Sequence, residues 1–208
     1  MNYLSPSEYE TYGLEATTSP AWVTAASALI DAHCRRTTLA ITQYLERLRL
    51  DPGRNTLRLS YLPLATVAPA TTPIVAARGR YGIPRRGEGP GGELAFDMAQ
   101  AFALPGTWAT IDPTVMDFYA ATGELTLPIS PLGLWFSELE VTYTAGLGTL
   151  TDTVKVACAQ LVRNAQATPA LNVRGGNIDR MRLEYFSDSL VDQNVRALLE
   201  PYVAQKVG

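Results

Sequence analysis

The stretch VTYTAGLGTLTDTVKVACAQLV, residues 141–162, decides the fold, because a strand pattern gives way to a helix pattern within it. Apolar and polar residues alternate up to Thr144, which is the period of a half-buried strand. Two glycines then interrupt the pattern, and Thr151 or Asp152 can cap a helix. The apolar face of that helix consists of Val154, Cys158, Leu161, Val162 and Ala165. A strand that leads into a helix predicts a mixed α and β chain.

Three further helices are expected on either side of this junction. Ser19 and Pro20 are typical of a helix start, and apolar residues follow at helical spacing as far as His33. A shorter helix is expected from Ser7 to Tyr12. A last helix is expected from Ser189 or Asp192 onward, with Pro201 kinking or ending it.

The residues between the helices favour strands. Residues 41–50 and 56–62 are β-leaning runs separated by turn residues, so they predict a hairpin. Short strands are also expected at 115–119 and 125–127, joined by a turn at Thr122-Gly123, and at 139–144. Residues 170–187 favour a strand or an extended arm.

We therefore expect an α+β fold in a single subunit, residues 1–208. The N-terminal and C-terminal helices, residues 7–38 and 151–208, are expected to form a small helical bundle. A β-rich insertion, residues 39–150, interrupts that bundle. Because Pro, Gly, Ala and Thr are frequent after residue 62, a long loop is expected near 68–113, with residues 87–92 exposed.

The bulk composition is that of a protein that folds without disulfide bonds or structural metal ions. Hydrophobic residues make up 47% and charged residues 18% of the 208 positions, which excludes wholesale disorder. The two cysteines, Cys34 and Cys158, have no ligand spacing, so we expect buried thiols in a reducing compartment. No apolar signal segment is expected at the N-terminus, and three prolines in the uncharged stretch 59–77 argue against a membrane helix.

Charge is segregated along the chain although the net charge is only −3. Residues 52–86 hold six arginines and no acidic residue, whereas residues 87–154 hold nine acidic residues and no basic one. The densest basic cluster consists of Arg78, Arg80, Arg85 and Arg86. Three interpretations stay open for it: pairing with acidic residues of the same domain, contact with another protein subunit, and contact with nucleic-acid phosphate.

The sequence predicts no enzyme, no cofactor and no metal site. The single histidine, His33, lies on an apolar helix stripe and has no second histidine with which to bind a metal. Residues 78–82 (RGRYG) resemble a glycine-containing phosphate-binding loop, but they lack the Gly-Lys-Ser/Thr ending of that motif. Glu138 and Glu140 share one face of a predicted strand, where paired carboxylates are usually a solvated surface.

Five segments together resemble one protein family, the head–tail connector or adaptor proteins of long-tailed double-stranded DNA bacteriophages. Residues 25–37 (AASALIDAHCRRT) resemble the first long helix of that family, and residues 141–162 resemble its strand end that leads into a helix. Residues 55–67 (NTLRLSYLPLATV) resemble the strand that follows the first long helix, together with its turn. Residues 121–128 (ATGELTLP) resemble a later strand–turn–strand, and residues 198–203 (LLEPYV) resemble the short terminus.

The resemblance implies a structural virion protein. Family members form a ring, usually a dodecamer, below the portal protein, and this ring joins the DNA-filled head to the stopper or tail. Genomic DNA passes through the channel without sequence-specific binding, and no membrane is involved. The protein would be made in the bacterial host cytoplasm and reside in the neck of the virion, at the head–tail junction. A neck or stopper protein of the same region and a DNA-binding accessory protein are the alternatives.

The resemblance also suggests roles for particular residues. The portal contact would be made by Leu198, Leu199, Pro201 and Tyr202. In a ring, the arginines Arg78, Arg80, Arg85 and Arg86 could contact the acidic block of a neighbouring subunit or another partner. Glu138 and Glu140 could face a partner or an acidic channel lumen that repels DNA.

Overall fold

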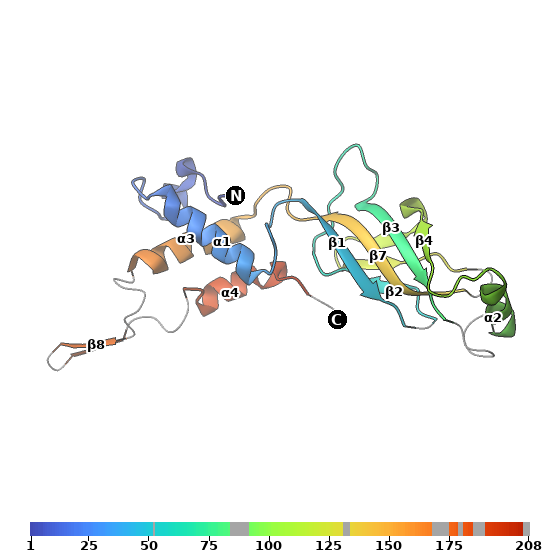
Figure 1. Cartoon of the computed structure of the whole chain (residues 1–208). Helices are drawn as coiled ribbons and strands as arrows, with labels where there is room; N and C mark the ends of the chain where they lie inside the picture. The colour runs from blue at the N-terminus through green and yellow to red at the C-terminus, as the bar shows by residue number, and fades with distance from the viewer. Residues whose placement is uncertain are drawn as a thin grey trace. The chain divides into compact units, whose positions relative to one another are not determined.

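The computed structural model describes residues 1–51, 53–83, 92–130, 134–167, 175–178, 181–184 and 190–205. Its fold class is α+β, as expected. The chain divides into two units, drawn in Figure 1. The helical unit comprises Met1–Leu39 and Thr149–Val203, and the β unit comprises Ala40–Gly148 together with Ala204–Gly208.

The helical unit contains three of the four described α-helices. They are α1 (Pro20–His33), α3 (Asp152–Ala167) and α4 (Gln193–Leu199). The Ser19 side chain caps α1 by accepting a hydrogen bond from the Ala21 N–H at 3.4 Å, and Pro20 is the first helical residue. Asp192 caps α4 in the same way, accepting from the Val195 N–H at 2.7 Å. The helix starts predicted from these residues are confirmed.

Both ends of the helical unit contain tighter turns. The helix expected from Ser7 to Tyr12 is instead two 3₁₀ turns, η1 (Pro6–Glu8) and η2 (Glu10–Tyr12). Gly13, whose backbone is left-handed with φ +76°, ends the second turn. Short segments of this kind often adopt the tighter 3₁₀ conformation. After α4, Pro201 lies in a further 3₁₀ turn, η4 (Glu200–Tyr202). Strands β8 (Gly175–Ile178) and β9 (Met181–Glu184) pair antiparallel where a strand or arm was expected.

The core of the helical unit is apolar and closely packed. Cys34 and Cys158 are buried free thiols, and burial raises the pKa of each to about 11. The largest buried side chains of this unit are Tyr3, Leu4, Tyr9, Val23, Ile30, Leu39, Leu161 and Leu199. Among the described helices, none has the length and apolar character to cross a membrane.

The β unit is built from two antiparallel sheets. The four-stranded sheet has the order β1 (Thr42–Arg49), β7 (Phe136–Ala145), β3 (Ile74–Tyr81), β4 (Trp108–Ile111). The three-stranded sheet has the order β2 (Thr56–Arg58), β6 (Glu124–Thr126), β5 (Asp117–Tyr119). One helix, α2 (Gly92–Ala101), and one 3₁₀ turn, η3 (Pro113–Val115), complete this unit.

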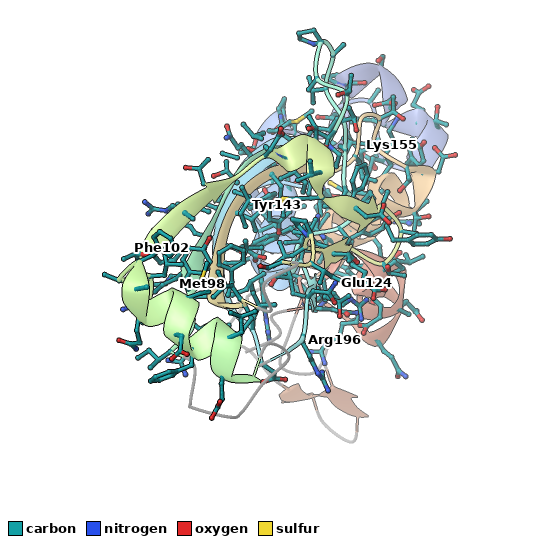
Figure 2. The ribbon with its side chains drawn as sticks, turned by 90° about the vertical axis from the view of Figure 1, so that its right-hand side faces the viewer. Met98, Phe102, Glu124, Tyr143, Lys155 and Arg196 are labelled. Carbon is teal, nitrogen blue, oxygen red and sulfur yellow. The ribbon has the colours of Figure 1, made fainter. Side chains whose placement is uncertain are left out.

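One hydrophobic core joins the inner faces of these two sheets. Leu139, Val141 and Tyr143 of β7 are fully buried in it, and Leu125 of β6 is buried with them. Figure 2 shows Tyr143 in the interior of the molecule. Because side chains alternate along a strand, burial of Leu139, Val141 and Tyr143 places Glu138 and Glu140 of β7 on the outer face of the sheet.

Two expectations about the β unit are wrong. Residues 41–50 and 56–62 do not form a hairpin: β1 pairs with β7, and β2 pairs with β6 in the other sheet. Nor is 68–113 one long loop, since its described part contains β3, α2 and β4. The expected exposed segment 87–92 lies outside the described residues, except for Gly92, which begins α2. The β5–β6 pair with its turn at residues 120–123 is confirmed.

Candidate functional site: a charged face of the four-stranded sheet

Six charged side chains form a regular array on the outer face of the four-stranded sheet. Arg47 of β1 and Arg78 of β3 lie opposite Glu140 of β7. One pleat along, Arg49 and Arg80 lie opposite Glu138. Each carboxylate therefore has an arginine on both neighbouring strands, a cross-strand arrangement that stabilises a sheet. We call these six residues the charged face.

The carboxylates of the charged face are paired with its arginines. Arg78 donates from Nε to Glu140 Oε1 at 2.7 Å and from Nη2 to Oε2 at 2.9 Å. Arg47 donates from Nε to Glu138 Oε2 at 2.8 Å, and Arg80 Nη1 lies 3.6 Å from Glu138 Oε1. The hydrogen bonds from Arg47 and Arg78 hold the pKa values of Glu138 and Glu140 below their ordinary range.

The arginines lie nearer the solvent than the carboxylates. The side chains of Arg47 and Arg78 are 55% and 52% exposed, whereas those of Glu138 and Glu140 are 19% and 21% exposed. The carboxylates thus hold the guanidinium groups in place while those groups stay accessible. With four arginines against two glutamates, this face carries an excess of positive charge.

Trp108 of β4 adds an aromatic surface to the charged face. The guanidinium carbon of Arg47 lies 5.1 Å from the centre of the Trp108 ring, and that of Arg78 lies 5.0 Å from it. Both distances are within the range of cation–π attraction. Arginine and tryptophan are both enriched at protein interfaces.

The structure brings together four of the residues singled out from the sequence: Arg78, Arg80, Glu138 and Glu140. The pairing of Arg78 and Arg80 is within one chain, which was the first of the three interpretations left open. Because Glu138 and Glu140 lie among four arginines, the described part of this face is not acidic, unlike the lumen surface suggested for them. Arg85 and Arg86 lie outside the described residues.

Arg47, Arg49 and Trp108 belong to the same face but were not predicted. The available signal was the alternation Arg-Leu-Arg at 47–49, which repeats the spacing of Arg78-Gly-Arg80 and is opposite in sign to Glu-Leu-Glu at 138–140. Only the strand order, with β7 between β1 and β3, brings the three segments side by side.

The Arg-Gly-Arg segment is a strand and not a phosphate cradle. Gly79 faces the inner side of β3, where a Cβ atom would lie 2.5 Å from the Phe136 ring. Gly82 makes similar room for the Trp135 ring, again at 2.5 Å. These glycines are therefore required by aromatic packing, and the geometry gives no loop whose backbone N–H groups converge on an anion.

The residues suggested for portal contact lie at the end of the helical unit. Leu199 is fully buried, so it belongs to the core of that unit. The Tyr202 hydroxyl is hydrogen-bonded to the Thr151 hydroxyl at 2.8 Å, which ties η4 to the start of α3. Leu198 is half-buried and Pro201 is exposed, so these two side chains are the more accessible members of the set.

The cavities of the β unit have neither histidine nor cysteine among their described lining residues. A cavity of about 310 Å³ in the β unit is lined mainly by Leu127, Ile129, Leu134, Trp135 and Phe136. No carboxylate, histidine or cysteine is found among its described lining residues. Nor do the described histidine, cysteine and acidic residues form a group of three or more that could hold a metal ion.

Comparison with known proteins gives matches among solved structures. No family model matches the chain, and no curated protein sequence matches it. A chain in the solved virion of a native gene transfer agent (GTA) particle aligns with 99% of this chain and 91% of its own length, at 16% identity and a TM-score of 0.43. A likeness with a TM-score this low does not establish a shared fold or function.

Proposed function

We propose that this protein is a head–tail connector: a structural virion protein that forms a ring below the portal and joins the DNA-filled capsid to the stopper or tail. In this role the ring leaves a channel through which DNA passes. The protein has neither substrate nor cofactor, and its partners are other copies of itself, the portal and the stopper or tail protein.

The observation that supports this proposal best is the junction at which β7 ends and α3 follows. The resemblance to connectors depends most on the strand end Tyr-Thr-Ala-Gly, residues 143–146. Gly146 has φ +133°, and a Cβ atom there would lie 2.4 Å from the Ala40 carbonyl oxygen. The glycine of the motif is thus required by the close passage of two backbone segments, which gives the sequence resemblance a structural basis.

The charged face supports a role in assembly over a role in DNA binding. Its carboxylates lie beneath the arginines and are paired with them, so they reduce the net attraction for phosphate. The whole chain also has a net charge of −3, which opposes general attraction to DNA. A DNA-binding accessory protein is therefore the weaker alternative, and a neck or stopper protein is the nearer one.

Electron microscopy of the purified protein mixed with the portal protein of the same virus tests the proposal. A ring stacked on the portal, with matching rotational symmetry, is the expected result. A stopper would associate only after a connector had been added. Failure to bind the portal, with the protein monomeric at every concentration in sedimentation experiments, would contradict the connector role.

Accessible residues at the C-terminal end provide the matched test of the portal contact. Leu198→Glu is expected to abolish portal binding, whereas Ala197→Glu, which adds the same charge at the exposed neighbouring position, is expected to preserve it. Truncation before Leu198 is unsuitable, because it removes the buried Leu199 and the hydrogen bond of Tyr202. Equal binding by both variants would exclude this end from the contact.

A further inference from the structure

The four-stranded sheet of the β unit has two edge strands, β1 and β4, on opposite sides of it (Figure 1). The Leu50 N–H donates to the Ser137 carbonyl at 2.8 Å, and this bond fixes which residues of β1 bond to β7. Because backbone groups alternate in direction along a strand, the odd-numbered residues of β1 direct their N–H and C=O groups away from β7. These outward residues are Gln43, Leu45, Arg47 and Arg49. Among the described residues, none of their outward backbone groups has a hydrogen-bond partner.

The edge at β4 is open in the same way. The Tyr81 N–H donates to the Thr107 carbonyl at 2.9 Å, so the odd-numbered residues of β4 bond to β3. Trp108 and Thr110 therefore direct their backbone groups away from the sheet, and in the described part of the chain these groups are also unpaired. A row of unpaired backbone groups is a template for another strand, and proteins usually cover or block it.

The edge of β1 is accessible. Leu45 is 66% exposed although it lies in the middle of the strand. A groove of about 770 Å³ is lined by residues of both β1 and β2, among them Arg49, Thr56 and Arg58. No described element therefore covers the edge at these two positions of β1.

Strand directions make the two edges complementary. Each neighbouring pair in the order β1-β7-β3-β4 is antiparallel, so β1 and β4 run in opposite directions. When a second copy is placed beside the first in the same orientation, β4 of one copy lies antiparallel to β1 of the other. The alternation of the sheet then continues across the junction. Each hydrogen-bonded pair of residues exchanges two bonds, so pairing of Trp108 and Thr110 would supply about four hydrogen bonds.

Charge favours β4 over a second β1 as the strand that pairs with this edge. Pairing of two β1 strands would bring Arg47 and Arg49 of both copies together, and like charges on facing strands are destabilising. Residues 108–111 carry no charge, and Asp112 follows them. The hydrogen bonds from Thr114 to Asp112 come from neutral donors and lower its pKa, so the negative charge of Asp112 is retained.

We propose that β4 of one copy adds to the edge of β1 in a second copy, so that the four-stranded sheets of neighbouring copies join into one continuous sheet. This inference rests on the proposed connector function, in which copies of the chain associate. The two edges differ, so each copy offers β4 to one neighbour and accepts β4 of the other neighbour at β1. Rotation about an axis along the strands preserves their orientation, and such head-to-tail contacts close into a ring when the rotation fits.

Disulfide cross-linking of the full chain tests the contact. Thr110→Cys is combined in turn with a cysteine at one of three outward positions of β1, namely Leu45→Cys, Arg47→Cys and Arg49→Cys. Three positions are needed because the alignment of the two strands sets which of them faces residue 110. Facing residues of a hydrogen-bonded pair have Cα atoms about 5.5 Å apart, a separation that disulfides span. At least one combination is expected to give a ladder of covalent oligomers that a reducing agent collapses.

Controls separate the proposed contact from random collision of thiols. Thr110→Cys with Tyr119→Cys places the second thiol at an exposed position of the three-stranded sheet, and this combination is expected to give no ladder. The native thiols of Cys34 and Cys158 are buried, so they are not expected to take part. Circular dichroism verifies that every variant is folded.

A proline in β1 tests the backbone hydrogen bonds directly. Leu45→Pro removes one outward N–H, and proline is tolerated in an edge strand where the missing N–H faces away from the sheet. This variant is expected to raise the dissociation constant for self-association by about tenfold or more, since it leaves a carbonyl of the neighbouring copy without its donor. Thr56→Pro, at an exposed and outward position of β2, is the matched control and is expected to leave association unchanged. Sedimentation velocity over a range of concentrations measures both.

Four results would overturn the inference. Association of the unaltered protein without a ladder in any of the three combinations would assign the contact to another surface, while portal binding could still support the connector role. Ready formation of dimers by Leu45→Cys alone, in place of a ladder, would show that two β1 strands pair with each other. Equal dissociation constants for Leu45→Pro and Thr56→Pro would exclude the β1 edge from the contact. Absence of self-association in the unaltered protein, alone and with portal, would reject the inference together with the proposed function.

Discussion

Arg78 of β3 and Glu140 of β7 lie directly opposite each other and form a two-point ion pair, with N–O distances of 2.7 and 2.9 Å. The pair joins the basic and the acidic parts of the sequence within one chain. Its planar geometry suits arginine, whose guanidinium offers two parallel donors to a carboxylate. Segregated charge in this sequence is therefore, in part, a consequence of strand pairing.

Replacement of Arg78 by methionine is expected to raise the pKa of Glu140. The hydrogen bonds from Arg78 favour the ionised carboxylate and lower this pKa, so their removal shifts it back toward the ordinary value. Carbon-detected NMR titration of the Glu side chains measures the change. Arg54→Met is the control, since Arg54 pairs with Asp51 and not with Glu140. An unchanged pKa of Glu140 would mean that the two-point pair is absent in solution.

Local signals in the sequence identified the elements whose ends are marked by particular residues. Ser19 with Pro20 and Asp192 begin helices where expected, and the Thr122-Gly123 turn joins a real pair of strands. Pairing of β1 with β7 was not predicted, because the paired residues are 89 to 103 positions apart in the sequence, from Arg49 and Glu138 to Thr42 and Ala145. Turn residues between 50 and 56 suggested a hairpin, but they instead lead the chain from one sheet to the other.

Only four of the six residues of the charged face were singled out from the sequence, again because pairing between distant strands was not predicted. Arg78 and Arg80 stood out as members of a dense cluster, and Glu138 and Glu140 as a spaced pair. Arg47, Arg49 and Trp108 were missed because each is ordinary in its own segment and gains its neighbours only through strand order. The region expected to be a loop contains β3 and β4, whose small and polar residues obscure their strand character.

Gly146→Ala is expected to destabilise the protein by about 2 kcal/mol or more, because strained positive-φ positions and backbone overlap each cost energy of that order. The added Cβ would lie 2.4 Å from the Ala40 carbonyl oxygen, and backbone there has little freedom to move. Urea unfolding measures the loss. Gly148→Ala is the matched control: its Cβ would have Ile41 Cδ1 as its nearest neighbour, at 3.8 Å, so it should be tolerated. Equal stability of the two variants would contradict the close passage of residues 40 and 146.

Glu8 in the helical unit is expected to make stability depend on pH in the acid range. The Nζ of Lys155 and the Ser5 backbone donate hydrogen bonds to its carboxylate, and they lower its pKa from 4.5 to about 2. The unfolded chain therefore takes up this proton first as pH falls, so stabilisation present above pH 4.5 is lost progressively toward pH 2.

Glu8→Gln tests this dependence through unfolding measured at several pH values. The variant is expected to be less stable than the unaltered protein at neutral pH and to lose less stability between about pH 5 and pH 2. This range runs from just above the ordinary Glu pKa of 4.5 down to the pKa of about 2 that Glu8 has in the fold. Glu10→Gln is the control, since the Glu10 carboxylate makes no hydrogen bond or ion pair among the described residues. Parallel pH profiles for Glu8→Gln and the unaltered protein would exclude the pairing with Lys155.

Tyr3→Phe is expected to cost about 1–3 kcal/mol, the usual penalty for a buried polar group that loses its partner. The Tyr3 hydroxyl donates to the Asp31 carboxylate and accepts from the Leu39 N–H at 2.8 Å, and the residue is only 1% exposed. Burial raises the pKa of this hydroxyl, with a further rise from the hydrogen bond to Asp31, so it stays protonated at neutral pH. Loss of the hydroxyl leaves the buried Leu39 N–H without its described acceptor at the point where the chain leaves the helical unit. Thermal unfolding is measured with Tyr12→Phe as the comparison, because the Tyr12 hydroxyl donates an exposed hydrogen bond to Asp152 at 2.6 Å, and this comparison isolates the effect of burial. If both substitutions lowered stability equally, the fold of the first 39 residues would not depend on the Tyr3 hydroxyl.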